Sequence, residues 1–331
     1  MRTDKHLVVL IALVLCAITL NATGTDHYVD AISGSDATGD GSQGSPWKTL
    51  TYATNTTVGE SPCVIHIAPG VYSPSANGET FPIVFLRGTG ELRGSGSDVT
   101  IIDAEGTYRV MQLTLDNGTV SDLTITGGGH PTKNHNGGGI SAYCAGGTIH
   151  LERCVVRDNY KGRGLDTGLT AGTYIITDCQ FINNNGPDDG SGAGINIANF
   201  VTMTMTNCLV ANNTTYDDPR FRGGGLFIAS DTHVTLINCT IVNNIKDGVY
   251  MANFRSTVGI YNCILWRNND DIRKNEAGNG HLTISHCNIS DGDGLGENGN
   301  ISQDPLFVTG AQGDYYLSHA GVNSKKKEKR K

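Results

Sequence analysis

Two loops of this 331-residue chain each carry a pair of adjacent aspartates. Asp188 and Asp189 lie in NGPDDGS (185–191), and Asp217 and Asp218 lie in TTYDDPRFR (214–222). Because Ca²⁺ takes several oxygen ligands, these four carboxylates are candidate calcium ligands. They could instead supply the two carboxyl groups that a glycoside hydrolase needs. A third interpretation is a pair of solvated turns, since Asp-Asp and Asp-Pro are common turn sequences.

Cations and aromatic residues lie close to these aspartates in the sequence. A polysaccharide lyase must neutralise a uronate carboxylate and then remove the adjacent proton. The candidate bases are Lys161, Arg220 and Arg222, although an arginine base would need a strongly perturbed pKa. The candidate substrate-binding residues are a histidine, a cation and three aromatic residues with faces for sugar rings: His135, Arg163, Tyr160, Tyr216 and Phe221.

A recurring phrase precedes most of these loops. Its copies are ERCVVRDN (152–159), TDCQFINN (177–184), TNCLVANN (206–213), INCTIVNN (237–244) and YNCILWRN (261–268), and HCNIS (286–290) begins the same way. The six cysteines are 25, 29, 31, 24 and 24 residues apart. A glycine phrase recurs with them: GGGI (137–140), GRGL (162–165), GAGI (192–195), GGGL (223–226) and DGV (247–249). Such a period is the signature of a repeat architecture.

Each repeat has one buried face. The residues two positions after each cysteine and three positions before it are all apolar. This spacing is typical of two short strands whose inward side chains alternate, with a bend in the chain just before the cysteine. One repeat cannot bury this face alone, but coils that pair strand over strand can. We therefore predict an all-β fold, a right-handed parallel β-helix with coils of about 24–31 residues.

Stacked coils place equivalent residues above one another, which makes two columns. The asparagines at 159, 184, 213, 244 and 268 should form a hydrogen-bonded ladder in a turn with left-handed backbone. The cysteines should form a column of small buried side chains with free thiols. Disulfides are the alternative, but in-register neighbours lie slightly far apart for relaxed disulfide geometry. A metal site in this column is disfavoured, because no CxxC pair occurs and His286 should face outward.

The insertions between repeats fall after the asparagine turn. They comprise residues 129–136, 160–163, 185–191, 214–222, 245–247 and 269–281. Loops are where solenoids usually place binding residues. We predict that this row of loops projects from one edge of the helix and walls a groove beside the strand that follows the glycines.

The beginning of the chain carries a family resemblance. HYVDAISGSDATGDGSQGSPWKTLTYAT (27–54) resembles the segment that caps the first coil in secreted β-helix proteins of the pectin-lyase-like superfamily. VIHIAPGVY (64–72) is similar to their first-coil phrase, and DPLFVTGAQGDYYLS (304–318) is similar to their closing phrase. The resemblance implies the fold over nearly the whole chain. It does not imply one activity, because one fold hosts many functions.

The two ends of the chain differ from its body. Residues 1–24 have the layout of a secretory signal peptide, with a cationic start and an apolar run over 7–20 that is short for a membrane span. We expect a secreted or cell-surface monomer with no transmembrane span after cleavage, a cap at 25–61, a β-helix at 62–303 and a closing segment with a basic tail at 304–331. Setting aside the +1 of residues 1–24 and the +5 of the tail at 324–331 turns the net charge of −8 into −14. This acidic body disfavours nucleic acid as a partner.

Two function classes remain open from the sequence. The first is a carbohydrate-active protein that binds polysaccharide or cell-surface glycan at the loops, with Ca²⁺ as its candidate cofactor. Cleavage would make it a polysaccharide lyase or a glycoside hydrolase, and neither motif is complete in the chain. The alternative is a non-catalytic structural protein or adhesin.

Overall fold

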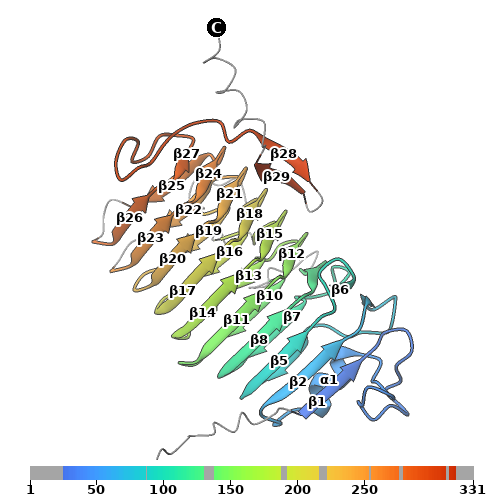
Figure 1. Ribbon diagram of the computed structural model, residues 1–331. Coiled ribbons are helices and arrows are strands. Elements are labelled where there is room, and N and C mark those ends of the chain that lie inside the picture. Colours follow the sequence, from blue (N-terminus) through green and yellow to red (C-terminus); the bar gives the residue numbers. More distant parts are fainter. Residues whose placement is uncertain are drawn as a thin grey trace, which may run out of the picture.

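The fold is a stack of coils. A computed structural model describes residues 25–86, 88–129, 138–187, 192–215, 222–252, 255–275, 279–310 and 313–317. In this part of the chain, three parallel sheets run the length of the stack, and each coil adds one strand to each sheet (Figure 1). Among the described residues, no helix is long and apolar enough to cross a membrane.

The strands of each sheet follow one another along the stack. Sheet 1 contains β1 (Thr25–Val29), β2 (Cys63–Ile67), β5 (Thr89–Arg93), β8 (Asn117–Ser121), β11 (Thr148–Glu152), β14 (Gly172–Thr177), β17 (Val201–Thr206), β20 (His233–Ile237), β23 (Thr257–Tyr261) and β26 (His281–Ser285). Sheet 2 contains β3 (Gly70–Tyr72), β6 (Thr100–Asp103), β9 (Thr124–Thr126), β12 (Val155–Arg157), β15 (Gln180–Ile182), β18 (Leu209–Ala211), β21 (Thr240–Val242), β24 (Ile264–Trp266) and β27 (Asn288–Ile289). Sheet 3 contains β4 (Ile83–Leu86), β7 (Met111–Thr114), β10 (Ile140–Tyr143), β13 (Leu165–Asp166), β16 (Ile195–Ile197), β19 (Leu226–Ile228), β22 (Asp247–Met251) and β25 (Asp270–Lys274).

The core is the inward face predicted from the cysteine phrase. Leu151 pairs with Ile176 in sheet 1, and Val156 pairs with Phe181 in sheet 2, so equivalent residues stack on one another. These residues are buried, as are the six cysteines of the phrase. All eight cysteines of the described part are free and buried, which agrees with the predicted column of thiols. Burial raises the pKa of the Cys179 thiol, so this group stays protonated and behaves as a small apolar side chain.

The asparagine ladder forms as predicted. Each side-chain amide donates to the side-chain oxygen of the next coil: Asn159 to Asn184 (2.8 Å), Asn184 to Asn213 (3.0 Å), Asn213 to Asn244 (2.9 Å) and Asn244 to Asn268 (3.0 Å). The same oxygens also accept the backbone N–H groups of the preceding asparagines. The ladder therefore satisfies buried backbone donors as well as its own amides.

The glycines of the repeated phrase leave the space that the ladder asparagines occupy. A Cβ on Gly164 would lie 2.9 Å from Asn184 Nδ2 and 2.6 Å from the Gly194 carbonyl oxygen. Gly194 has the same relation to Asn213, with 3.0 Å to its Nδ2. The last glycine of each phrase thus packs against the ladder asparagine of the next coil, at a distance that leaves no room for a side chain.

The left-handed backbone lies one residue earlier than predicted. The residues with positive φ are those just before the ladder asparagines, such as Asn183 (φ 56°) and Asn212 (φ 56°). A second such row precedes the cysteines and includes Asp178 (φ 55°) and Asn207 (φ 55°). Two single-residue corners of this kind therefore flank each of the strands β12, β15, β18, β21 and β24 in sheet 2. Asparagine and aspartate are common at both because they tolerate this conformation.

Helix α1 (Leu50–Thr56) closes the N-terminal end of the core. It begins at the N-cap Thr49, whose hydroxyl accepts the Tyr52 N–H at 3.1 Å. Its Leu50 is fully buried, and Trp47 just before it is nearly so. The segment resembling a cap thus covers the end of the stack, and its strand β1 is also the first strand of sheet 1.

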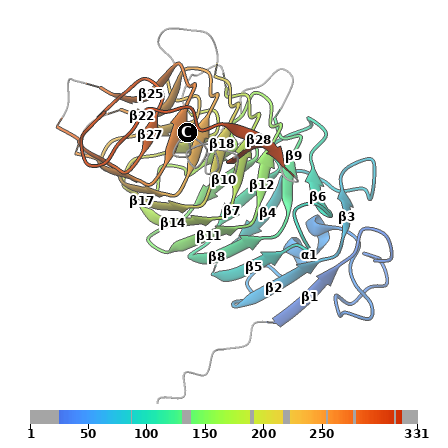
Figure 2. The same cartoon turned by 45° about the horizontal axis from the view of Figure 1, so that its top comes forward.

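The C-terminal part departs from the predicted loop row. Residues 269–281 were expected to be one loop after the asparagine turn, but Asp270–Lys274 is the strand β25 and pairs with β22. The polar sequence DDIRK hides this strand, since Ile272 is its only apolar residue. Beyond the stack, β28 (Phe307–Gly310) and β29 (Gly313–Leu317) form an antiparallel hairpin beside sheet 2 (Figure 2).

Candidate functional site

A groove lies over the outward face of sheet 2. Its volume is about 950 Å³, and we call it the outer groove. Ile101, Val155 and Ile182 contribute apolar surface, and the remaining lining is mostly polar or charged: Gly96, Ser97, Asp98, Asp122, Thr124, Arg153, Arg157, Asp178 and Gln180. A second hollow of about 310 Å³ shares Asp178 and Gln180 with it. It extends along sheet 2 to Tyr315 and Tyr316 of the C-terminal hairpin.

The repeat itself builds this groove. The residue after each cysteine points outward from sheet 2 because side chains alternate along a strand, and Val155 and Gln180 are in direct register there. The residue before each cysteine occupies the left-handed corner, so its side chain borders the same face. The outward residues of successive coils therefore form one row, and the corner residues form a second row parallel to it. Within each row, neighbouring residues are about 4.8 Å apart, the spacing of paired strands.

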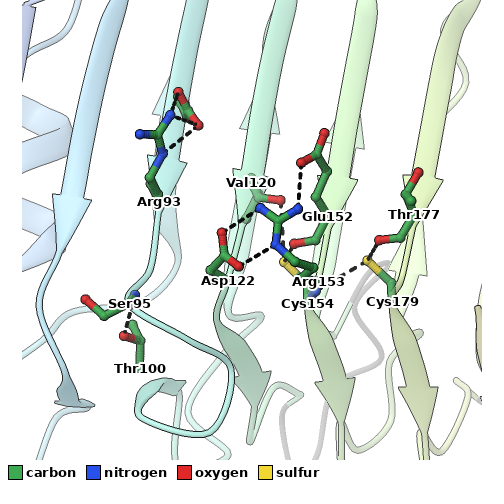
Figure 3. A network of polar contacts seen from close by, with 11 residues as sticks. Arg93, Ser95, Thr100, Val120, Asp122, Glu152, Arg153, Cys154, Thr177 and Cys179 are labelled. Carbon is green, nitrogen blue, oxygen red and sulfur yellow. Dashed lines mark hydrogen bonds and ion pairs between the residues drawn. The ribbon is translucent and has the colours of Figure 1, made fainter.

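An ion-paired network forms the border of the outer groove (Figure 3). Arg153 donates from Nε to Asp122 Oδ1 (2.6 Å) and from Nη2 to Asp122 Oδ2 (2.8 Å), and it reaches Glu152 at 3.1 Å. The hydrogen bond from Arg153 holds the pKa of Asp122 below its usual value, and the same bond raises the pKa of Arg153. Both groups are therefore charged near neutral pH. Their charges and paired hydrogen bonds suit them to holding a ligand, and the lowered pKa makes Asp122 a weaker base than an ordinary aspartate.

Arg157 lies at the opposite end of the same short strand. Its guanidinium is 2.5 Å from Asp158 Oδ2, and both side chains are partly exposed. Arg153 and Arg157 thus place a planar hydrogen-bonding group on each side of Val155. The sequence missed this site because Arg153 and Asp122 are 31 residues apart and meet only through the stacking of coils. The available signal was the residue before each cysteine, where Arg153 replaces the usual Asp or Asn.

The C-terminal hairpin is attached to sheet 2 by polar contacts. The Tyr315 hydroxyl donates to Asn212 Oδ1 at 2.8 Å and accepts from Asn243 Nδ2 at 3.0 Å. Both asparagines occupy left-handed corners of successive coils. The hairpin therefore borders the hollow that continues the outer groove.

Most of the sequence-predicted site residues lie outside the described part of the chain. These are His135, Asp188, Asp189, Tyr216, Asp217, Asp218, Arg220 and Phe221. Of the others, Tyr160 is 51% exposed beside sheet 2, with Lys161 Nζ 5.9 Å from its ring centroid. Arg222 is partly buried, and its charge acts on Asp247. A groove walled by these loops beside sheet 3 stays a prediction.

Arg163 is a structural residue on the outer side of sheet 3. It is only 4% exposed, and its Nη1 lies 3.6 Å from Asp166 Oδ2. Asp166 also accepts a hydrogen bond of 2.8 Å from Asn196 Nδ2 on the next coil. Two coils further, the rings of Phe227 and Tyr250 are in contact, with centroids 5.4 Å apart and planes tilted by 36°. Arg163 was predicted to bind substrate, and in the structure its guanidinium lies buried beside Asp166.

An acidic group lies near the C-terminal end of the stack. Carboxylate oxygens of Asp270, Asp291 and Asp293 lie within 4.8 Å of one another, a spacing that a Ca²⁺ ion could bridge. Asp291 and Asp293 belong to DGDG (291–294), a turn that resembles part of a calcium loop. Partial burial and the neighbouring Asp291 and Asp270 raise the pKa of Asp293 to about 6.

This raised pKa predicts a pH dependence of stability. The folded state binds the Asp293 proton more tightly than the unfolded chain does, so protonation of Asp293 stabilises the folded state. This stabilisation is complete below the ordinary aspartate pKa of about 4. It is lost as the pH rises through 6. We expect the free energy of unfolding of the wild-type protein to fall over this range, and that of Asp293→Asn to fall less. Denaturant titrations at several pH values without calcium would test this, and identical profiles for the two proteins would contradict it.

A family model agrees with the fold. Residues 189–310 match the family described as "Right handed beta helix region", and residues 32–140 match "Protein of unknown function (DUF1565)". No curated protein matches the sequence. Three solved structures are similar to this chain: ORF18 of Geobacillus virus E2, the GH136 lacto-N-biosidase from Eubacterium ramulus and a rhamnogalacturonan lyase.

The likeness to these structures is distant. The viral protein has a TM-score of 0.43 and 15% identity over 72% of this chain. The lacto-N-biosidase (78% of this chain) and the rhamnogalacturonan lyase (73%) each have a TM-score of 0.38 and 13% identity. The chain spans 56% of the viral protein, 68% of the lacto-N-biosidase and 74% of the lyase.

Proposed function

We propose that this chain, a right-handed parallel β-helix protein of pectin-lyase-like fold, binds a linear polysaccharide along the outer groove. The observation that carries the proposal is the shape and lining of the groove. It crosses four successive coils, from Gly96 to Ile182, which is about 14 Å along the stack. An elongated groove that combines apolar surface with charged hydrogen-bonding groups suits an extended chain of sugars, whose rings have apolar faces and hydroxyl edges.

The lining residues have distinct roles in this proposal. Val155 and Ile182 offer apolar contact to the faces of sugar rings, while Arg153 and Arg157 donate to hydroxyl or carboxylate oxygens. Asp122 and Asp178 accept from hydroxyl groups. The groove carries both signs of charge, and residues 25–324 are strongly acidic. A neutral polymer is therefore the favoured ligand, and a polyuronate would need Ca²⁺ between the two negative surfaces.

Cleavage is a separate proposal, which we assign to the loop row. Asp122 and Arg153 are paired with each other, and the lowered pKa of Asp122 makes it a weak base. Any lyase or hydrolase chemistry would fall to the predicted loop residues, with Lys161, Arg220 or Arg222 as base and the aspartates of 188–189 and 217–218 as acid or calcium ligands. Tyr160 could contact a polymer near this edge, because its ring is exposed beside sheet 2.

A panel of neutral polymers and polyuronates tests both proposals, with calcium and with a chelator. Binding without release of new chain ends would support a binding protein. Unsaturated ends would establish a lyase, and reducing ends without unsaturation would establish a hydrolase. Absence of both binding and release across the panel would overturn the proposed function and leave the structural alternative.

Arg153→Ala should weaken binding to the polymer identified in this way about tenfold or more. A hydrogen bond to a charged group contributes about 1.5–3 kcal/mol, and 1.4 kcal/mol corresponds to a factor of ten in Kd. Isothermal titration calorimetry would measure the change in Kd.

The chain offers a closely matched control for this variant. Arg255 makes the same paired hydrogen bonds to Asp231, at 2.6 and 2.9 Å, and both residues also have positive φ. Arg255 lies between sheets 3 and 1, away from the outer groove. Arg255→Ala should leave Kd unchanged. Equal effects of the two variants would show that the groove border does not contact the polymer.

A further inference from the structure

A cluster of three different metal-binding side chains lies at the N-terminal end of the stack. His27 belongs to β1, Glu60 lies in the turn before β2, and Cys63 is the first residue of β2. The possible donor atoms, His27 Nε2, a Glu60 carboxylate oxygen and Cys63 Sγ, all lie within 4.8 Å of one another. These three segments meet because β1 pairs in parallel with β2, with Thr25 opposite Cys63 and His27 opposite Ile65.

The three side chains are buried to different extents, from partly exposed Glu60 to fully buried Cys63. The Glu60 side chain is 39% exposed, the His27 side chain is 12% exposed, and Cys63 is 2% exposed. Glu60 therefore forms a mouth open to solvent, and the sulfur forms the floor. An ion could enter past Glu60 without disturbing the core beneath Cys63.

The histidine ring is held in place before any ion binds. It stacks on Trp47, with ring centroids 5.0 Å apart and an angle of 20° between the planes. Trp47 is itself buried. His27 Nε2 faces Glu60 Oε2 at 2.7 Å, so the nitrogen that would bind a metal already points at the second ligand.

We propose that His27, Glu60 and Cys63 form a site for a divalent transition metal ion, with Zn²⁺ as the chemically favoured occupant. Histidine nitrogen, carboxylate oxygen and thiolate sulfur are each ligands that Zn²⁺ binds, and three protein ligands with a fourth position left to solvent is a coordination that Zn²⁺ adopts. Bond lengths of about 2.0–2.3 Å imply donor separations of about 3.3–3.6 Å in a tetrahedral site. Side-chain shifts of about 1 Å would reach this geometry from the observed positions.

Binding at this site releases protons. The Cys63 thiol loses its proton as the metal–sulfur bond forms, and the His27 proton must reside on Nδ1 or leave the ring so that Nε2 can coordinate. Because coordination removes these protons, the affinity should increase with pH. A bound ion would connect β1, the turn after α1 and β2, and would stabilise the cap of the β-helix.

Cobalt(II) titration of the purified, reduced protein tests the proposal, because a cobalt–thiolate bond has its own charge-transfer absorption. We expect one equivalent of cobalt to produce this band and zinc to remove it by competition. Cys63→Ser should abolish the band. Glu60→Gln, at the partly exposed mouth, should keep the fold and weaken cobalt binding at least about tenfold.

Cys144→Ser is the matched control, because Cys144 is also a free, buried cysteine of another coil. It should leave both the band and the affinity unchanged. Absence of a thiolate band in the wild-type protein would overturn the proposal. So would a band that persists in Cys63→Ser or an affinity that Glu60→Gln leaves intact. The outcome does not depend on polysaccharide binding, which uses different residues.

Discussion

Replacing Asn213 by leucine should lower the free energy of unfolding by about 4 kcal/mol. Asn213 is fully buried in the middle of the ladder. Its side-chain oxygen accepts from the backbone N–H and the side-chain amide of Asn184, and its amide donates to Asn244 and to the Phe181 carbonyl. Leucine preserves the approximate volume but removes all four bonds. It leaves at least the Asn184 N–H and the Phe181 carbonyl without these partners, at about 1–3 kcal/mol for each buried group.

Asn207→Gly provides the comparison for the ladder variant. Asn207 is exposed at a left-handed corner of the same coil, and its amide makes one surface hydrogen bond of 3.2 Å to Asp178. Glycine keeps the left-handed backbone, so its effect should remain below about 1 kcal/mol. Urea denaturation followed by circular dichroism measures both variants. A loss for Asn213→Leu as small as that for Asn207→Gly would refute a stabilising role for the ladder.

The repeat was readable from the sequence because side-chain alternation and coil stacking impose the same residue types at the same positions. In DLTITGGG (122–129) Leu123 stands where the later repeats have cysteine, and it is buried like those cysteines. His286 is exposed, as expected for a residue just before the cysteine. The burial or exposure of each of these residues follows from its place in the repeat.

Contacts between unlike residues of different coils were not readable in the same way, in contrast to the columns of identical residues. The pairing of Arg153 with Asp122 requires the exact register of β8, β11 and their corners, which local sequence does not encode. The strand β25 forms because β22 supplies its pairing partner, in spite of its polar composition. Likewise, the positive charge of Arg163 beside a predicted loop suggested contact with a ligand. In the structure it forms a buried ion pair with Asp166, three residues along the chain.

The ladder has a direction, and its C-terminal end meets the side chain of an aspartate. Every amide donates toward the C-terminal coil, so the positive ends of the amide dipoles point that way and add up at Asn268. There the acceptor is the fully buried carboxylate of Asp271, whose Oδ1 accepts Asn268 Nδ2 at 2.8 Å and Asn268 N at 3.2 Å. Its Oδ2 accepts the N–H and the hydroxyl of Ser290, both at 2.7 Å, and the Asp291 N–H at 3.3 Å.

Asp271→Asn should therefore lower the free energy of unfolding by about 3 kcal/mol. An amide has one acceptor oxygen, so its NH₂ group would face donors from either Asn268 or Ser290, and the charge that strengthens these bonds would be lost. Asp270→Asn is the neighbouring control. Asp270 is partly exposed and pairs with Arg273 at 3.3 Å, so its loss should cost less than about 1 kcal/mol. Denaturant titrations near neutral pH compare the two variants. If they were equally stable, the charge at the end of the ladder would have no special role, and the ladder would be held by its amides alone.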